Sequence, residues 1–325
     1  MRICFYFRRH CGIFAPHYFM TMTPNKNAKT IAEAVQSLAD ACTLKKFFCQ
    51  RQPGEPLPSG PRLREVIDLC RALLFPGFYG EATTEEASLP YYIGVDTKRL
   101  FSILSEQIAA GLCLCRAKTD ANCNLTLQER AADLAAQLIG RLPEVRRLLI
   151  TDVEAAYNGD PAAESYDEII CCYPVIKALT VYRVAHELVQ LDVPLIPRIL
   201  TEMAHSETGI DIHPAATIGS HFTIDHGTGV VIGATCIIGD HVKLYQGVTL
   251  GARSFPLDEN GNPIKHIPRH PILGNGVIVY SNSTILGRIT IGDNATIGGN
   301  VWLTHDVPAG AVIRQTPCAP EQQEK

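Results

Sequence analysis

The chain has 325 residues, of which 46% are hydrophobic and 19% charged, and its formal net charge is -4 at pH 7. This length accommodates two domains, and a slightly acidic chain without a basic run argues against nucleic-acid binding. The 12 cysteines show neither a CxxC pair nor the spacing of a zinc site, so we expect free thiols in a reducing compartment, the cytoplasm.

The N-terminal segment, MRICFYFRRHCGIFAPHYFMTM, mixes arginines with aromatic residues. Its apolar run before Arg8 is five residues long, which is too short for the core of a signal peptide. We expect residues 1–29 to be poorly defined, with the working chain starting at Met20 or Met22; a short targeting segment is the alternative. No stretch approaches the ~20 apolar residues of a membrane span, so we expect no membrane partner.

Residues 30–209 carry the pattern of amphipathic helices and are expected to form an α-helical assembly domain. The segment 50–62, QRQPGEPLPSGPR, predicts a loop because it is rich in proline and glycine. Pro174 predicts a break in the helix around it, and Gly209 suits the C-cap of the last helix. The apolar stripes are clearest at Leu100, Ile103, Leu104 and Ile108, and again at Val181, Val184, Ala185 and Leu188.

From Ile212 the apolar period changes to six residues, and glycine often follows the repeated aliphatic position. This repeat predicts a parallel β-helix, in which each hexad forms one short strand and one corner. We therefore expect an α+β chain, with the β-helix at 210–316 and a tail at 317–325. The repeated positions are 212, 218 and 224, then 232, 238, 244 and 250, and then 273, 279, 285, 291, 297 and 303.

The repeat slips once, because the step from Ile224 to Ile232 is eight residues long, and His226 lies inside this step. If residues 212, 218 and 224 lie on faces one, two and three, the extra residues bulge at the corner between faces three and one. Asp211 occupies that corner one coil earlier, so we expect it within hydrogen-bonding reach of His226. An aspartate beside a histidine is typical of a general base; a surface hydrogen bond that caps a loop is the alternative.

A second interruption separates Leu250 from Leu273 by 23 residues and inserts a loop, 252–271, at the corner between faces one and two. Loops on rigid scaffolds often carry function, although a solvated polar excursion is the alternative. The return of the loop carries Lys265, His266, Arg269 and His270.

Several motifs resemble the serine O-acetyltransferase family of hexapeptide-repeat enzymes: YPVIKALTVYRVAHEL, GIDIHPAATIG, IDHGTGVVIG, YQGVTLGA, RHP and IGGNVWLT. The resemblance covers roughly residues 150–315. It implies a left-handed β-helix, a homotrimer or dimer of trimers, and an acyl-CoA groove between neighbouring β-helices. It also implies transfer of acetyl from acetyl-CoA to the hydroxyl of L-serine, in cysteine biosynthesis, without a metal.

The resemblance gives roles to residues at both interruptions of the repeat. His226 matches the general base of the family, and Asp211 matches its orienting partner. Asp225 matches a residue near the serine amino group. Arg269 matches the arginine that pairs with the serine carboxylate, where a guanidinium fork fits two oxygens, and His270 matches a second active-site histidine.

Further roles fall outside the two interruptions. Asp160, in the motif GDPAA, matches a substrate-binding aspartate of the helical domain, although from the residues alone it would be a helix N-cap before Pro161. Backbone contacts with CoA map onto Ala252, Ser281 and Gly299.

One partner of the family is in doubt for this chain. In the family, a C-terminal isoleucine docks into O-acetylserine sulfhydrylase. This chain ends in APEQQEK, and Lys325 cannot play that part.

Three other functions are compatible with a hexapeptide β-helix. The acetyl acceptor could be another hydroxyl compound, such as a sugar or an antibiotic, but those enzymes usually lack a long helical domain. A non-catalytic assembly subunit would not need Asp211, His226, Arg269 and His270 together. A zinc enzyme of carbonic anhydrase type would need three histidines at one place, and the candidates are His221, His226 and His241.

Overall fold

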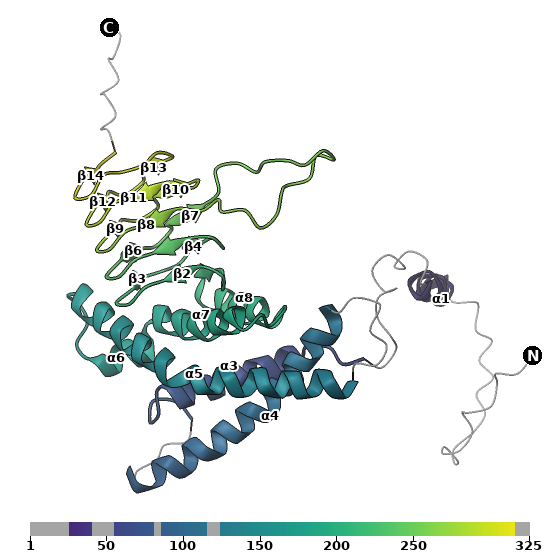
Figure 1. The fold of residues 1–325 in the computed structure, drawn as a ribbon. Helices are drawn as coiled ribbons and strands as arrows, with labels where there is room; N and C mark the ends of the chain where they lie inside the picture. Colours follow the sequence, from purple (N-terminus) through teal and green to yellow (C-terminus); the bar gives the residue numbers. More distant parts are fainter. Residues whose placement is uncertain (1–25, 41–54, 81–85, 116–123, 316–325) are drawn as a thin grey trace, which may run out of the picture. The chain divides into compact units, whose positions relative to one another are not determined.

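The computed structural model describes residues 26–40, 55–80, 86–115 and 124–315, which form parts of two compact units, Met1–Pro53 and Gly54–Lys325. The predictions for residues 1–22 and for the tail 317–325, including Lys325, fall outside the described residues. The first unit contains helix α1, Lys26–Ala39. The second unit contains the other helices and the β-helix (Figure 1).

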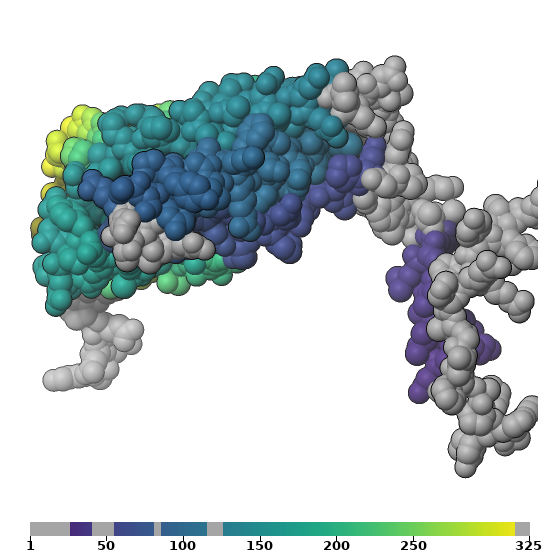
Figure 2. Space-filling view, turned by 90° about the horizontal axis from the view of Figure 1, so that it is seen from below, coloured from purple at the N-terminus to yellow at the C-terminus, as the bar shows by residue number. Residues whose placement is uncertain are grey.

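The helices of the second unit pack around the apolar stripes that the sequence predicts, and Leu100, Leu104 and Ile108 are fully buried. Figure 2 views the unit from the side where α3, α4 and α5 form the surface. The helices are α3 (Gly60–Leu74), η1 (Glu86–Ser88), α4 (Leu89–Cys115), α5 (Asn124–Gly159), α6 (Tyr166–Cys172), α7 (Pro174–Gln190) and α8 (Ile196–Thr208).

Proline and glycine set several helix ends. The break predicted at Pro174 is confirmed, because α6 ends at Cys172 and α7 begins with that proline. Gly209 caps α8 in the left-handed conformation, with φ of 72°, a value that costs glycine little. The predicted loop 50–62 is too long at its end, because α3 begins at Gly60 with Pro61 in its first turn, where the missing N–H of proline is harmless.

The β-helix consists of three parallel sheets, which are the faces that the hexads predict (Figure 1). Face one contains β1 (Asp211–Ile212), β4 (Val231–Ile232), β7 (Thr249–Gly251), β10 (Thr284–Leu286) and β13 (Trp302–Leu303). Face two contains β2 (Thr217–Ile218), β5 (Ile237–Ile238), β8 (Ile272–Leu273) and β11 (Thr290–Ile291). Face three contains β3 (Thr223–Asp225), β6 (Lys243–Tyr245), β9 (Ile278–Val279), β12 (Thr296–Ile297) and β14 (Val312–Ile313).

The register confirms how the two interruptions thread through the coils. Ile232 pairs with Ile212 on face one, so the slip at His226 lies at the corner between faces three and one. Leu250 lies on face one and Leu273 on face two, so the loop 252–271 leaves the corner between these faces. All thirteen predicted repeat residues are buried.

The glycine that follows the aliphatic residue makes room for a side chain of the next coil. At the corner between faces two and three, a Cβ on Gly219 would lie 2.5 Å from Asp240 Oδ1, and a Cβ on Gly239 would lie 2.5 Å from Asn275 Oδ1. Asp240 Oδ1 accepts from Ser220 N at 2.7 Å, and Asn275 Oδ1 accepts from Asp240 N at 2.8 Å. The small residue is therefore required by the hydrogen bond that joins two coils.

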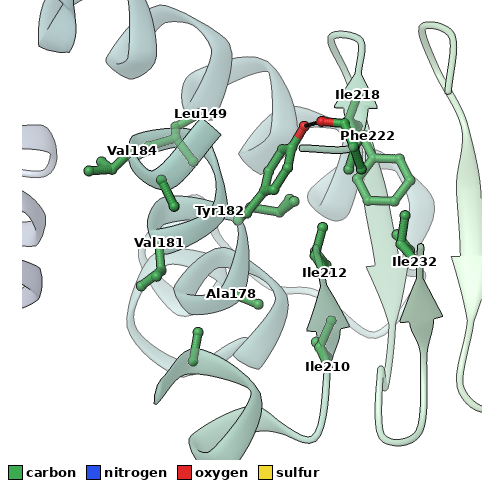
Figure 3. Close-up of a cluster of buried hydrophobic side chains, with 14 of the residues drawn as sticks. Leu149, Ala178, Val181, Tyr182, Val184, Ile210, Ile212, Ile218, Phe222 and Ile232 are labelled. Atoms are coloured by element: carbon green, nitrogen blue, oxygen red, sulfur yellow. Dashed lines mark hydrogen bonds between the residues drawn. The ribbon is translucent and has the colours of Figure 1, made fainter. Parts of the chain in front are cut away.

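Helix α7 covers the first coil of the β-helix, whose backbone would otherwise form an open edge. The Tyr182 hydroxyl donates to the Ala216 carbonyl at 2.6 Å, which is the dashed line in Figure 3. Arg183 donates through Nη2 to the Gly219 carbonyl at 2.8 Å, and its Nε lies 2.6 Å from Asp152 Oδ2 on α5. These bonds fix the helical layer against the β-helix, and so position the helical residues that reach the candidate site.

Within the described ranges, no single helix is long and apolar enough to cross a membrane. Helices α6 and α7 reach that length and composition only as a pair, across a bend of 71°.

Candidate active site

The slip in the repeat is a left-handed turn that projects His226 outward. His226, Gly227 and Gly229 have φ values of 59°, 92° and 80°. Gly229 N donates to the Gly209 carbonyl at 2.9 Å, and Asp211 N donates to the Val230 carbonyl at 2.9 Å. The turn therefore stacks on residues 209–211, as the threading predicts. We call the corner between faces three and one, which carries residues 225–230, 245–248, 280–283 and 298–301, the base edge.

The side chains of His226 and Asp211 point to different neighbours. The His226 side chain is 74% exposed, and its Nε2 lies 3.9 Å from Asp225 Oδ1. Asp211 Oδ1 lies 3.8 Å from Arg198 Nη1 on α8. In the part of the chain that the structure describes, no hydrogen bond or ion pair joins His226 to Asp211. The left-handed backbone at His226 turns the imidazole toward solvent, so the pairing stays a prediction.

Asp160 approaches the base edge from the helical layer. It follows α5 in a tight turn rather than capping a helix, because its Oδ1 accepts from Ala162 N at 2.8 Å. Its Oδ2 accepts from the Tyr173 hydroxyl at 2.6 Å. The hydrogen bond from Tyr173 has the largest effect in lowering the pKa of Asp160, and the hydrogen bond from Ala162 N comes next. The charges of Lys243 and His226 lower this pKa further. The carboxylate is therefore held in a defined orientation beside the base edge.

The corner between faces one and two, which we call the loop edge, carries residues 233–236, 252–271 and 287–289. Thr235 Oγ1 accepts from the backbone N–H groups of Arg269 at 2.9 Å and His270 at 3.1 Å. In return, His270 Nδ1 accepts from Thr235 N at 3.1 Å. Because Nδ1 is an acceptor, the ring proton of the neutral imidazole lies on Nε2. His270 is thus a fixed hydrogen-bond donor, and Arg269 is anchored next to it.

His270 stays neutral because it is buried, with 7% of its surface exposed. Burial lowers its pKa to about 4, and the charges of Arg269, His213 and Arg288 act in the same direction. Gly233 leaves space for the ring, since a Cβ there would lie 2.1 Å from His270 Cδ2. The imidazole is therefore suited to donate a hydrogen bond rather than to accept a proton.

This low pKa predicts a pH-dependent contribution to stability. An unfolded histidine takes up a proton near its ordinary pKa of about 6.5, whereas folded His270 does so only near about 4. The free energy of unfolding should therefore fall as the pH drops from about 6.5 toward 4. His270→Asn keeps an acceptor for Thr235 N and should make this fall shallower. Urea unfolding at several pH values measures the free energy of unfolding, and the exposed His266→Asn is the control. If this free energy fell equally steeply with pH in wild type and His270→Asn, the prediction would be wrong.

The residues expected to contact CoA are divided between the two edges. Ser281 and Gly299 lie in successive coils of the base edge, where a Cβ on Gly299 would be 3.3 Å from the Ser281 carbonyl. Ala252 begins the loop at the loop edge, next to the end of β7. The predicted site residues thus gather at two edges of one chain, with face one between them.

The sequence reading missed several side chains at these edges. Lys243 Nζ lies 3.1 Å from Asp225 Oδ2 and 2.6 Å from the Gly159 carbonyl. Tyr245 and Tyr280 stack with ring centroids 4.9 Å apart, directly along the base edge from Asp225. The register could have placed both tyrosines there, because they follow the repeat residues 244 and 279. The contact between Lys243 and the helical layer carries no signal in a repeat pattern.

The three histidines of the zinc alternative do not meet. His221 and His241 stack with centroids 4.2 Å apart at the corner between faces two and three, whereas His226 lies on the base edge. Among the described residues, the group with potential metal ligands within 4.8 Å is Glu202, His205 and Asp211. The Arg198 guanidinium lies 3.8 Å from Asp211, and a positive charge at this distance disfavours a cation.

Comparisons with known proteins show which family and fold the chain shares. Residues 270–305 match the family described as bacterial transferase hexapeptide (six repeats). A protein of Synechococcus elongatus named "Serine acetyltransferase, plasmid" is 50% identical over 262 residues, which cover 80% of this chain and 82% of that protein. The serine acetyltransferase of Bacillus subtilis is 40% identical over 171 residues, covering 53% of this chain and 75% of that protein.

Two solved structures from Entamoeba histolytica share the fold. Serine acetyltransferase isoform 3 in complex with cysteine is 32% identical, with a TM-score of 0.67 over 92% of this chain and 94% of that one. Serine acetyltransferase 1 in complex with L-cysteine is 31% identical, with a TM-score of 0.68 over 88% and 100% of the two chains. Since the identity to the Synechococcus protein extends over most of both chains, this protein belongs to the serine acetyltransferase family.

Proposed function

We propose that the chain transfers the acetyl group of acetyl-CoA to the hydroxyl of L-serine, giving O-acetylserine and CoA. The observation that carries the proposal is the meeting of His226, Asp225 and Asp160 at one edge of the β-helix. An exposed imidazole suits a general base, and two carboxylates suit the ammonium group of an amino acid. Membership of the serine acetyltransferase family supports the same substrate.

The proposed reaction needs one proton carrier. His226 accepts the proton of the serine hydroxyl while the serine oxygen attacks the thioester carbonyl of acetyl-CoA. The tetrahedral intermediate carries an oxyanion, which backbone N–H groups stabilise. The intermediate then expels the CoA thiolate, and protonated His226 returns the proton to the sulfur. Asp211 is proposed to orient the imidazole once the substrates are bound.

Two buried polar atoms that have no hydrogen-bond partner among the described residues fit this chemistry. They are Arg269 Nε on the loop edge and Gln246 Oε1 on the base edge. A buried polar group that lacks a hydrogen bond is costly and suggests a ligand. Arg269 can donate to the serine carboxylate, and Gln246 can accept from an amide of CoA, which we place along Ser281 and Gly299.

The separation of the edges supports a composite site. Face one separates His226 from Arg269 within one chain, so a small substrate cannot reach both. In a cyclic trimer, each subunit presents one edge to the next. We therefore propose that each site combines His226 of one subunit with Arg269 and His270 of its neighbour. A second layer of trimers stays a prediction from the resemblance, a cytoplasmic location stays a prediction from the cysteine pattern, and the sulfhydrylase partner stays in doubt.

The test of the proposed function is an assay of free thiol. Purified protein should release CoA from acetyl-CoA when L-serine is added, in the presence of a chelator. A panel of other hydroxyl compounds, including sugars and amino alcohols, should be much slower acceptors. Release that does not depend on serine would contradict the proposal, and activity that chelation abolishes and zinc restores would favour the zinc alternative.

A further inference from the structure

One side chain, Lys243, joins the helical layer to the base edge. Lys243 lies on β6, next to the buried Leu244, and only 15% of its side chain is exposed. Its Nζ donates to the Gly159 carbonyl at 2.6 Å and lies 3.1 Å from Asp225 Oδ2. The same Nζ lies 4.6 Å from the centroid of the Tyr245 ring. A single ammonium group therefore contacts a helix end, a carboxylate and an aromatic face.

The contact with Gly159 fixes the position of Asp160. Gly159 is the last residue of α5, so its carbonyl is among those that lack a partner within the helix. A cation at this end also interacts favourably with the helix dipole. Asp160 follows directly and begins the turn in which Ala163 N donates to the Asp160 carbonyl at 3.1 Å. Lys243 thus holds the residue immediately before the turn that carries the helical carboxylate.

Lys243 also acts on two negative charges, those of Asp225 and Asp160. Burial disfavours its charged form, but the interactions with Tyr245 and Asp225 outweigh burial and raise the pKa of the ammonium. Lys243 therefore stays charged beside Asp225 on the β-helix, and its charge also lowers the pKa of Asp160 on the helical layer. Without this charge, the two carboxylates would repel one another, and the end of α5 would lose the hydrogen bond from Lys243 Nζ to the Gly159 carbonyl.

We propose that Lys243 is a positioning residue for the amino-acid substrate, which holds Asp160 against Asp225 so that both carboxylates bind the ammonium group of serine. The inference rests on the proposed function. It makes a definite choice between two effects of removing the charge. Loss of a positive charge alone would strengthen the attraction for a cationic group, whereas loss of position would weaken binding, and the proposal requires the second effect to dominate.

The experiment compares Lys243→Met, which keeps most of the stem but removes the charge, with wild type. Loss of a charged hydrogen bond that sets geometry should lower kcat/KM for serine at least ~10-fold, mainly through KM. KM for acetyl-CoA should change less than ~2-fold, because CoA is proposed to lie on Ser281 and Gly299. Lys177→Met is the matched control, since Lys177 is also partly buried and pairs with a carboxylate, Glu207, on the helical layer.

A second readout does not depend on activity. Hydrogen exchange at the amides of Ala162 and Ala163 reports the turn after α5, and it should be faster in Lys243→Met than in wild type or Lys177→Met. Unchanged or lower KM for serine, or unchanged exchange at these amides, would overturn the inference. If wild type fails to acetylate serine, the proposed function and the substrate role of Lys243 fail together, while the exchange data still decide whether Lys243 holds the turn.

Discussion

His226→Ala should lower kcat by at least ~10²-fold, the usual contribution of a positioned proton-transfer group. The alanine cannot accept the hydroxyl proton of serine, and it cannot return a proton to the CoA thiolate. The wild-type rate should also fall on the acid side of its pH profile, because a protonated imidazole is not a base. Steady-state kinetics with saturating acetyl-CoA and serine measure both effects.

His305→Ala is the matched control, because His305 is also exposed and lies in the last coil at the corner between faces one and two, away from the base edge. Its kcat should stay close to that of wild type. The assignment would be wrong if His226→Ala kept a near-normal kcat while its unfolding transition shifted. His226 would then be a structural residue of the left-handed turn.

Two inactive variants, His226→Ala and Arg269→Ala, should recover activity when they are unfolded and refolded together in equal amounts. A composite site works when its histidine comes from the Arg269→Ala chain and its arginine from the His226→Ala chain. Random cyclic assembly gives this combination at about one half times one half, or roughly a quarter of the sites. The mixture should therefore reach about a quarter of the wild-type activity.

The controls are each variant refolded alone, which should stay inactive, and a measurement that mixed trimers have formed, for example with two tags. Mixed trimers without activity would show that both residues serve the site of their own chain. The proposed meeting of the base edge of one subunit with the loop edge of the next would then be incorrect.

The β-helix could be predicted from the sequence in detail, because an aliphatic residue at every sixth position is compatible with few other structures. The register of Ile212 with Ile232, and the exit of the loop after Leu250, both follow from counting hexads. The corners that hold His226 and Arg269 follow in the same way. Counting hexads therefore predicts the face or corner of the coil on which each residue lies.

The directions of the side chains could not be predicted in this way. Counting places Asp211 and His226 at one corner, but it does not predict that His226 lies near Asp225 and Asp211 near Arg198. The role of Lys243 was missed because its partner Gly159 is 84 residues away in the sequence and belongs to a helix with a different period. A repeat pattern predicts contacts between coils, but it gives no information on contacts between the repeat and the rest of the chain.

The hydrogen bonds at the corner between faces two and three make neighbouring coils depend on one another. Gly219 is small because Asp240 reaches over it, and Gly274 is small because Asp293 Oδ1 would lie 2.2 Å from a Cβ there. The residue that is tolerated at each glycine position therefore depends on the side chain that the next coil places over it. Substitutions at the two positions are not additive. The same arrangement recurs along this corner, where Asp240, Asn275 and Asp293 each reach over the glycine of the preceding coil. These side chains form a ladder, because each Oδ1 accepts from a backbone N–H of the preceding coil, so losing one Asp or Asn would leave a donor of its neighbour without this bond.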